Sequence, residues 1–187
     1  MRKYLIVIAA VMAASSVHSE TVQHDPTTVY ALPFKSGSCV RVLMGYDDPR
    51  GHTGDRRFAI LFGAPVGTEV LAARGGVVAG TGTVPHGDDP GTSRGDYVLV
   101  RHSDGTFGAY IHLRHKGAAV AKGQSVKTGQ LLGYSGCFGR CDAGVLHFHV
   151  STPMDERRSD YKTFPTVFKT GQDSVEFLEA NRCYLVP

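Results

Sequence analysis

The sequence predicts an all-β protein, built on a mainly antiparallel sheet that folds into a sandwich or an open barrel. Seven short segments between residues 39 and 151 are rich in Val, Leu, Tyr and Phe and are bounded by Gly, Pro, Asp or Ser, as strands are. No helical period is sustained over this region. Most of the 23 glycines fall between the apolar segments, where tight turns need them.

Each of these segments is expected to form a strand. In chain order they cover residues 39–46, 56–62, 69–80, 96–102, 107–113, 130–136 and 145–151. The polar stretch 84–96 is expected to be a solvent-facing loop. The near-repeat "KGQ…TGQ" at 122–130 predicts two turns, at Gly123 and Gly129. Residues 173–182 predict one or two helical turns.

The chain divides into four parts. Residues 1–19 have the basic start, the apolar run and the small residues of a secretory signal peptide. Residues 20–38 form a polar lead-in, residues 39–153 the β domain, and residues 154–187 a tail packed on or tethered to that domain. The apolar run is short for a membrane span, and no later segment is apolar enough for one. We therefore expect an exported protein, periplasmic or secreted.

The charge balance argues against nucleic acid as a partner. Without Arg2 and Lys3, eighteen basic residues face seventeen acidic ones, and no basic stripe stands out. Trp is absent, so there is no obvious stacking platform for bases.

The four cysteines predict disulfides, since the count is even and the chain is exported. Cys137 and Cys141 enclose only three residues and suit a local bridge, while Cys39 and Cys183 lie near the two ends of the mature chain. The sequence alone does not fix the pairing. A metal site made of cysteines is the weaker interpretation, because no CxxC motif occurs.

The segment "GVLHFHV" holds two histidines, His147 and His149, one residue apart. Alternate residues of a strand point to the same face, so the two imidazoles are expected side by side. Paired imidazoles on an apolar strand suggest a zinc site.

Four blocks in order resemble the M23 (LytM or lysostaphin-type) zinc metallopeptidases: "FAILFGAPVGTEVLAARGGVV", "DYVLVRHSDGTFGAYIHL", "VAKGQSVKTGQLLGYSG" and "LHFHV". The resemblance implies an open, barrel-sandwich-like β-sheet with a groove, zinc as the cofactor, and peptidoglycan as the substrate of active members.

The family holds its zinc with a first His, an Asp, and the last His of an H-x-H strand. The first ligand corresponds to His52, and the Asp position corresponds to Leu61, which cannot bind a metal. Asp55 is the nearest substitute but lies outside the expected register. The catalytic histidine of the family's "Y-x-H-L" strand corresponds to His112. Tyr110 of the same motif is expected to line the groove.

Aligning "L-H-F-x-V" without a gap puts the last zinc ligand on His147. The first His of the family motif then falls on Val145, and His149 takes the place of its usual Glu. A two-residue insertion in "CFGRCDAG" gives the alternative register, in which His147 and His149 keep the usual roles, His149 as the ligand and His147 as the catalytic histidine. A site of His52, His147 and His149 is a further alternative.

The two apolar replacements predict a degenerate member of the family, with zinc absent or weakly bound and catalysis impaired. Such a protein would bind peptidoglycan or a cell-wall hydrolase. An active zinc endopeptidase with a non-standard site, using His112 and His149 as catalytic groups, is the second hypothesis. The third is a binding module unrelated to the cell wall, suggested by the "KGQ…TGQ" hairpin.

Overall fold

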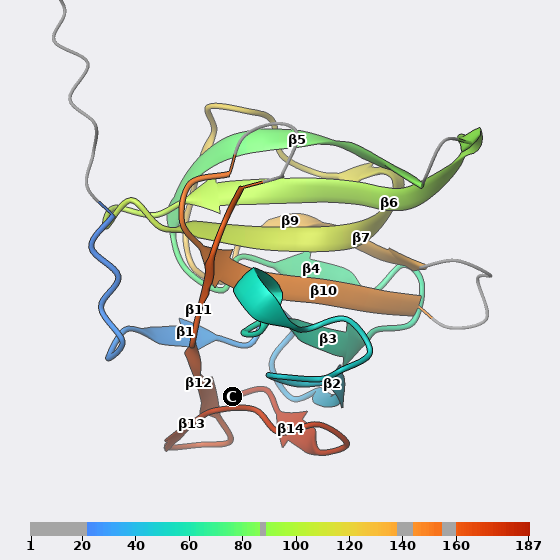
Figure 1. Cartoon of the computed structure of the whole chain (residues 1–187). Coiled ribbons are helices and arrows are strands. Elements are labelled where there is room, and N and C mark those ends of the chain that lie inside the picture. The colour runs from blue at the N-terminus through green and yellow to red at the C-terminus, as the bar shows by residue number, and fades with distance from the viewer. Residues whose placement is uncertain (1–21, 87–88, 138–143, 155–159) are drawn as a thin grey trace, which may run out of the picture.

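The strands of this chain arrange into one large curved sheet and one small sheet beneath it (Figure 1). The computed structural model describes residues 22–86, 89–137, 144–154 and 160–187, so the expected signal peptide lies outside the described residues. The elements are β1 (Val29–Ala31), β2 (Cys39–Met44), the 3₁₀ turn η1 (Gly54–Arg56), β3 (Ile60–Gly63), β4 (Glu69–Leu71), β5 (Gly76–His86), β6 (Asp89–Arg101), β7 (Phe107–Ala118), β8 (Ser125–Val126), β9 (Leu131–Cys137), β10 (Gly144–Ser151), β11 (Thr163–Phe164), β12 (Val167–Thr170), β13 (Ser174–Glu176) and β14 (Cys183–Leu185).

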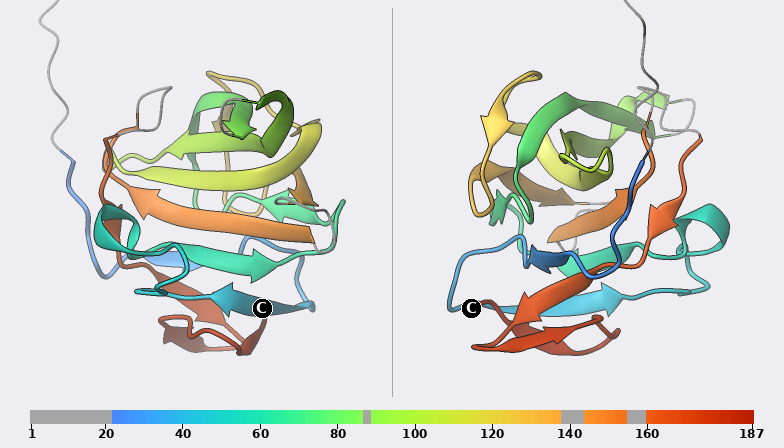
Figure 2. Two further views of the ribbon diagram at one scale, coloured as in Figure 1. Left: turned by 45° about the vertical axis from the view of Figure 1, so that its right-hand side comes forward. Right: turned by 90° about the vertical axis from the view of Figure 1, so that its left-hand side faces the viewer.

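The large sheet runs in the order β14-β2-β3-β10-β9-β7-β6-β5-β8, and its pairings are antiparallel. The all-β prediction is therefore confirmed, and the sheet is open. Figure 2 shows how strongly the sheet curves, with β5 and β6 at one end and β2 at the other. Within the described ranges no helix is long and apolar enough to span a membrane.

Strand β10 is the hub of the large sheet. It pairs with β3 along one side, and on the other side its first residues pair with β9 and its later ones with β7. Its far end also pairs with β11. Side chains on β10 therefore meet side chains from four other strands.

Each face of the sheet carries its own apolar cluster, as the period of two requires. The main core holds the largest buried side chains, among them Tyr30, Phe62, Tyr110, Phe148 and Phe168. The opposite face holds a smaller cluster of Tyr97, Leu99, Phe107, Ala109, Ile111, Met154 and Tyr161. The histidines of β10 lie on this second face.

Two local predictions turned out differently, and the lead-in also takes part in the fold. The expected loop 84–96 is largely the end of a long hairpin, because β5 extends to His86 and β6 begins at Asp89. The lead-in is not separate from the fold, since β1 pairs with β12 in the small sheet. Residues 174–176 form strand β13 and not a helix, because backbone pairing with β12 outweighs a weak helical period.

The two predicted Gly-Gln turns are built alike. Gly123 and Gly129 have φ of +88° and +79°, which glycine adopts without strain. In each turn the following glutamine accepts a hydrogen bond through its side-chain oxygen from a backbone N–H three residues earlier: Gln124 from Ala121 at 3.2 Å and Gln130 from Lys127 at 3.1 Å. The repeated sequence thus encodes a repeated turn.

The structure shows that Cys39, Cys183 and Cys137 are all disulfide-bonded, as the even cysteine count predicted. Cys39 is bonded to Cys183, which joins β2 to β14. Cys137 is also disulfide-bonded, while Cys141, its expected partner, lies outside the described residues.

Candidate functional site

Three histidines gather around His147 on the second face of the sheet. The ring of His147 lies 5.2 Å from that of His52, 6.0 Å from that of His112 and 5.3 Å from that of His149, measured between ring centroids. His52, His112 and His149 are buried and His147 is half-buried. Residues far apart in the sequence therefore form one histidine cluster.

The alternation of β10 places two of these rings. Leu146, Phe148 and Val150 point into the main core, so His147 and His149 point to the opposite face. The Nε2 of His147 lies 3.2 Å from the Nδ1 of His149, so one of the two nitrogens donates a hydrogen bond to the other.

A β-bulge turns His112 toward the cluster. Asp96 and Tyr97 are consecutive in β6, yet they pair with Leu113 and Ile111, which leaves His112 as an extra residue. His112 has φ of +69°, a left-handed conformation that a non-glycine residue adopts only at a cost. The bulge allows Leu113 to stay in the main core while the imidazole beside it lies near His147.

His52 lies in the loop before η1. Its Nδ1–H donates to the carbonyl of Gly45 at 2.8 Å, which fixes the tautomer with Nε2 unprotonated in the neutral ring. Burial lowers the pKa of His52, although the Gly45 carbonyl and the nearby Asp48 oppose this shift. The ring is therefore neutral at neutral pH.

Two aliphatic residues occupy the positions that the resemblance assigned to polar groups. Leu61 on β3 pairs directly with His147, and Val145 pairs with Gly63 two residues along the same strands. Residues directly opposite each other on two paired strands project from the same face of the sheet, so Leu61 lies beside His147. His149 has no partner on β3 in this ladder and pairs with Ala109 of β7.

The donor atoms around His147 do not fit a catalytic zinc site. Such a site needs three protein ligands and a water molecule, usually with one carboxylate or a third imidazole. Here the residue facing His147 from β3 is a leucine, which has no donor atom. Across the described ranges, no group of three or more His, Cys, Asp or Glu residues is arranged to hold a metal ion.

Two sequence-predicted site residues lie elsewhere. Tyr110 was expected to line the groove, but it is 0% exposed in the main core and its hydroxyl accepts a 2.7 Å hydrogen bond from the N–H of Ala73. Burial accordingly raises its pKa. Alternation along β7 explains the correction, because Tyr110 faces away from Ala109 and Ile111. Asp55 lines a neighbouring pocket and is exposed.

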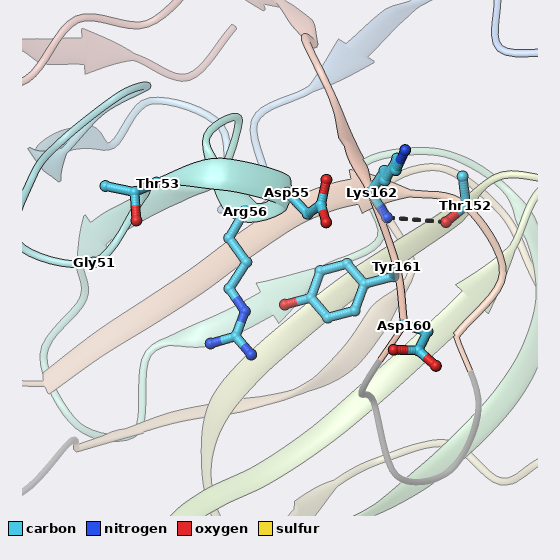
Figure 3. A pocket seen from close by; sticks show the side chains of 8 residues that line it. All are labelled: Gly51, Thr53, Asp55, Arg56, Thr152, Asp160, Tyr161 and Lys162. Atoms are coloured by element: carbon cyan, nitrogen blue, oxygen red, sulfur yellow. Dashed lines mark hydrogen bonds between the residues drawn. The ribbon is translucent and has the colours of Figure 1, made fainter.

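That pocket has a volume of about 640 Å³ (Figure 3) and adjoins the histidine cluster through Tyr161. Its walls are the loop that carries His52 and the segment after β10, and its lining residues are Gly51, Thr53, Asp55, Arg56, Thr152, Asp160, Tyr161 and Lys162. The ring of Tyr161 stacks on His149 with centroids 4.9 Å apart and an interplanar angle of 4°. The guanidinium of Arg56 lies 5.9 Å from the centroid of the Tyr161 ring.

The sequence did not point to Arg56 or Tyr161. Tyr161 follows His149 by twelve residues and stands in no motif, and Arg56 is one of two adjacent arginines. The sequence hint was the long polar stretch 154–162, which precedes β11.

Comparisons with known proteins agree with this fold. A family model described as Peptidase family M23 matches residues 56–160. The peptidoglycan DD-endopeptidase ShyA of Vibrio cholerae is 32% identical over 114 residues, which cover 59% of this chain and 24% of that protein. The cell division protein DipM of Caulobacter vibrioides is 37% identical over 99 residues, covering 52% of this chain and 15% of DipM. The chain thus spans a quarter or less of these relatives.

Solved structures show the same fold at low identity. The catalytic domain of a mutant of the prophage-encoded M23 protein EnpA from Enterococcus faecalis matches with a TM-score of 0.52 at 22% identity, over 71% of this chain and 92% of that one. A zinc-containing peptidase from Vibrio cholerae matches with a TM-score of 0.50 at 24% identity, over 70% of this chain and 40% of that one. From the family match over more than half of its length, this chain belongs to peptidase family M23.

Proposed function

We propose that this protein acts at the bacterial cell wall as an M23-fold protein that binds peptidoglycan, or a hydrolase that acts on it, with peptide hydrolysis lost or strongly impaired. The observation that carries the proposal is the direct pairing of Leu61 with His147. This pairing sets an aliphatic side chain beside His147, and it supports the proposal because the family resemblance assigns the carboxylate ligand to residue 61.

The chemistry of a zinc peptidase gives the reason. The metal must lower the pKa of its bound water to near neutrality and polarise the scissile carbonyl. Two neutral imidazoles, His52 and His147, offer no negative charge to offset a divalent cation. Val145 then supplies no proton-transfer group where the resemblance expects a histidine.

The cell-wall part of the proposal rests on relatives and on the N-terminus. ShyA is a peptidoglycan endopeptidase by name, and DipM is a cell division protein by name. The first nineteen residues have the composition of a secretory signal. Export would bring the domain to the compartment where peptidoglycan lies.

The test combines metal content, binding and cleavage on the purified mature chain. After zinc reconstitution and desalting, we expect little retained zinc, co-sedimentation of the protein with purified sacculi, and no release of soluble muropeptides. Retention of about one zinc per chain, lost in both His52→Ala and His147→Ala, together with muropeptide release, would overturn the loss of catalysis. Failure both to sediment with sacculi and to bind a cell-wall hydrolase would overturn the binding role.

The second candidate function is an active zinc endopeptidase with a non-standard site. The histidine cluster favours it, because four imidazoles lie around one point and three-histidine zinc sites exist in other proteins. The same metal and cleavage measurements distinguish the two candidates, and His149→Ala would then abolish zinc retention as well.

A further inference from the structure

We infer that the pocket beside the histidine cluster binds a zwitterionic peptide end, with Arg56 taking a carboxylate and Asp160 taking an ammonium group. This deepens the proposed function and rests on it for the source of the peptide. The inference itself comes from the pocket's size, its mixed charge and its aromatic wall.

The charged groups of Arg56 and Asp160 are available to a ligand in the pocket. Within the described part of the chain, no hydrogen bond or ion pair joins the charged groups of Arg56 and Asp160 to other side chains, although nearby Arg57 pairs with Asp47 at 2.9 Å. In Figure 3 the guanidinium of Arg56 and the carboxylate of Asp160 lie on the same side of Tyr161, toward opposite ends of its ring. A ligand with one positive and one negative group can therefore meet both.

Tyr161 forms the wall between these charges and offers a ligand little ring surface. Tyr161 is 9% exposed and is held by its stack on His149. The guanidinium carbon of Arg56 lies 5.9 Å from the centroid of the same ring, and a guanidinium can take a carboxylate through two parallel hydrogen bonds. Lys162 and Asp55 add a second pair of opposite charges to the lining.

The walls are fixed to each other, so the pocket is largely formed before a ligand arrives. The hydroxyl of Thr163 donates to the carbonyl of Asp55 at 2.9 Å and accepts from the N–H of Phe58 at 3.0 Å. These bonds fasten the loop that carries Arg56 to the segment that carries Tyr161. A volume of about 640 Å³ suits a few amino-acid residues.

The position of the pocket ties it to the candidate site. Gly51 and Thr53, on either side of His52, line it, and Tyr161 touches His149. A peptide anchored by its charged groups in the pocket would extend over the histidine cluster. Because the charged groups are exposed, we expect weak binding that falls further as salt rises.

The experiment titrates the ¹⁵N-labelled mature chain with N-acetyl-Lys-D-Ala-D-Ala, which carries one ammonium and one carboxylate, and follows backbone NMR shifts. Two analogues, one acetylated on the lysine amine and one amidated at the C-terminus, each lack one charge. We expect shifts around residues 51–56 and 160–162, and affinity about fivefold weaker for either analogue.

Two substitutions assign the charges. Arg56→Gln should weaken the zwitterion about fivefold and abolish the preference for carboxylate over amide, while Asp160→Asn should abolish the preference for the free amine. The controls are Arg57→Gln, which removes the adjacent arginine outside the pocket, and Asp173→Asn, an exposed aspartate in the turn between β12 and β13. Both should bind like wild type.

Equal binding of all three peptides, shifts confined to other regions, or no binding at millimolar concentration would overturn the inference. Sedimentation with sacculi distinguishes a failure of the pocket inference from a failure of the proposed cell-wall function. If the protein sediments with sacculi but the peptides fail to bind the pocket, the inference falls and the cell-wall role stands. If the protein fails to sediment with sacculi but the peptides bind, the pocket inference is supported, and the pocket takes its ligand from a source other than the cell wall.

Discussion

The side chain of His147 depends on its neighbours for any chemistry. Its ring nitrogen is within 3.2 Å of His149, its ring lies 5.2 Å from that of His52, and Leu61 faces it from β3. Imidazoles supply lone pairs but, when neutral, no charge. A leucine supplies neither, so the residue opposite His147 decides what the cluster can hold.

Restoring the two polar positions should restore metal binding. We expect Leu61→Asp to raise zinc affinity about tenfold or more, because it adds an anionic donor beside His147, and Leu61→Asp with Val145→His to raise it further. Isothermal titration with zinc measures this. The matched control is Leu185→Asp on the exposed edge strand β14, which should leave zinc binding unchanged. Zinc affinity unaltered in both restored variants would show that Leu61 does not occupy the ligand position.

His102, away from the cluster, should make stability pH-dependent. Burial lowers its pKa from 6.5 to about 4, against the opposing hydrogen bond to the Gly75 carbonyl. The unfolded chain therefore binds a proton more readily, and folding stability falls as pH drops from 6.5 toward 4, by up to about 3 kcal/mol.

Urea unfolding at pH 7 and pH 4.5 of wild type and His102→Gln measures this contribution. The variant should lose less stability between the two pH values, since the carboxylates titrate alike in both proteins. The same loss in wild type and variant would contradict the assignment to His102.

At the scale of the elements, β10 positions the site because it pairs with both β3 and β7. These pairings bring Leu61 and Ile111 to opposite sides of His147. The bulge in β7 adds His112 without disturbing the core residues beside it. Any change that shifts β10 along its partners would move the whole cluster.

Gly144 sets the start of β10, and its replacement should be costly. A Cβ at this position would lie 2.1 Å from the carbonyl oxygen of Ala64 and 2.4 Å from the N of Val66, both backbone atoms that cannot rotate away. We expect Gly144→Ala to lower the free energy of unfolding by about 2 kcal/mol or more in urea unfolding.

Gly80→Ala in β5 provides the control for this prediction. The nearest atom to its added Cβ is a ring carbon of Tyr97 at 4.0 Å, so the change should be tolerated. If both alanine variants unfold at the same urea concentration, β10 does not approach Ala64 as closely as described.

At the scale of the whole molecule, strands from the first and last parts of the described chain pair with one another. Strand β14 pairs with β2, and β1 pairs with β12, so the segments after residue 160 close the side of the fold that begins at β1 and β2 (Figure 1). The Cys39–Cys183 disulfide spans 144 residues across this closure.

Removing this disulfide should destabilise the whole fold. Closing so long a loop limits the unfolded chain, so we expect Cys39→Ser with Cys183→Ser to lose about 2–5 kcal/mol of unfolding free energy. Urea unfolding without reductant measures this and keeps the bond at Cys137 intact. An unchanged unfolding midpoint would mean that the β14–β2 pairing holds the ends without the covalent bond.

The sequence by itself determined the main strands between residues 39 and 151, the Gly-Gln turns and the membership of an M23-type fold, because strand composition, glycine placement and motif order are local properties of the chain. It also singled out His52, His112, His147 and His149 before their distances were known.

Only the tertiary structure decided which side chains face one another. It buried Tyr110, turned His112 at a bulge, set Leu61 against His147 and brought Tyr161 onto His149. It also turned the expected helix of the tail into β13 and drew the lead-in into a sheet. Each of these outcomes depends on pairing between segments distant in sequence, and pairing register is a property of the assembled sheet that no single segment encodes.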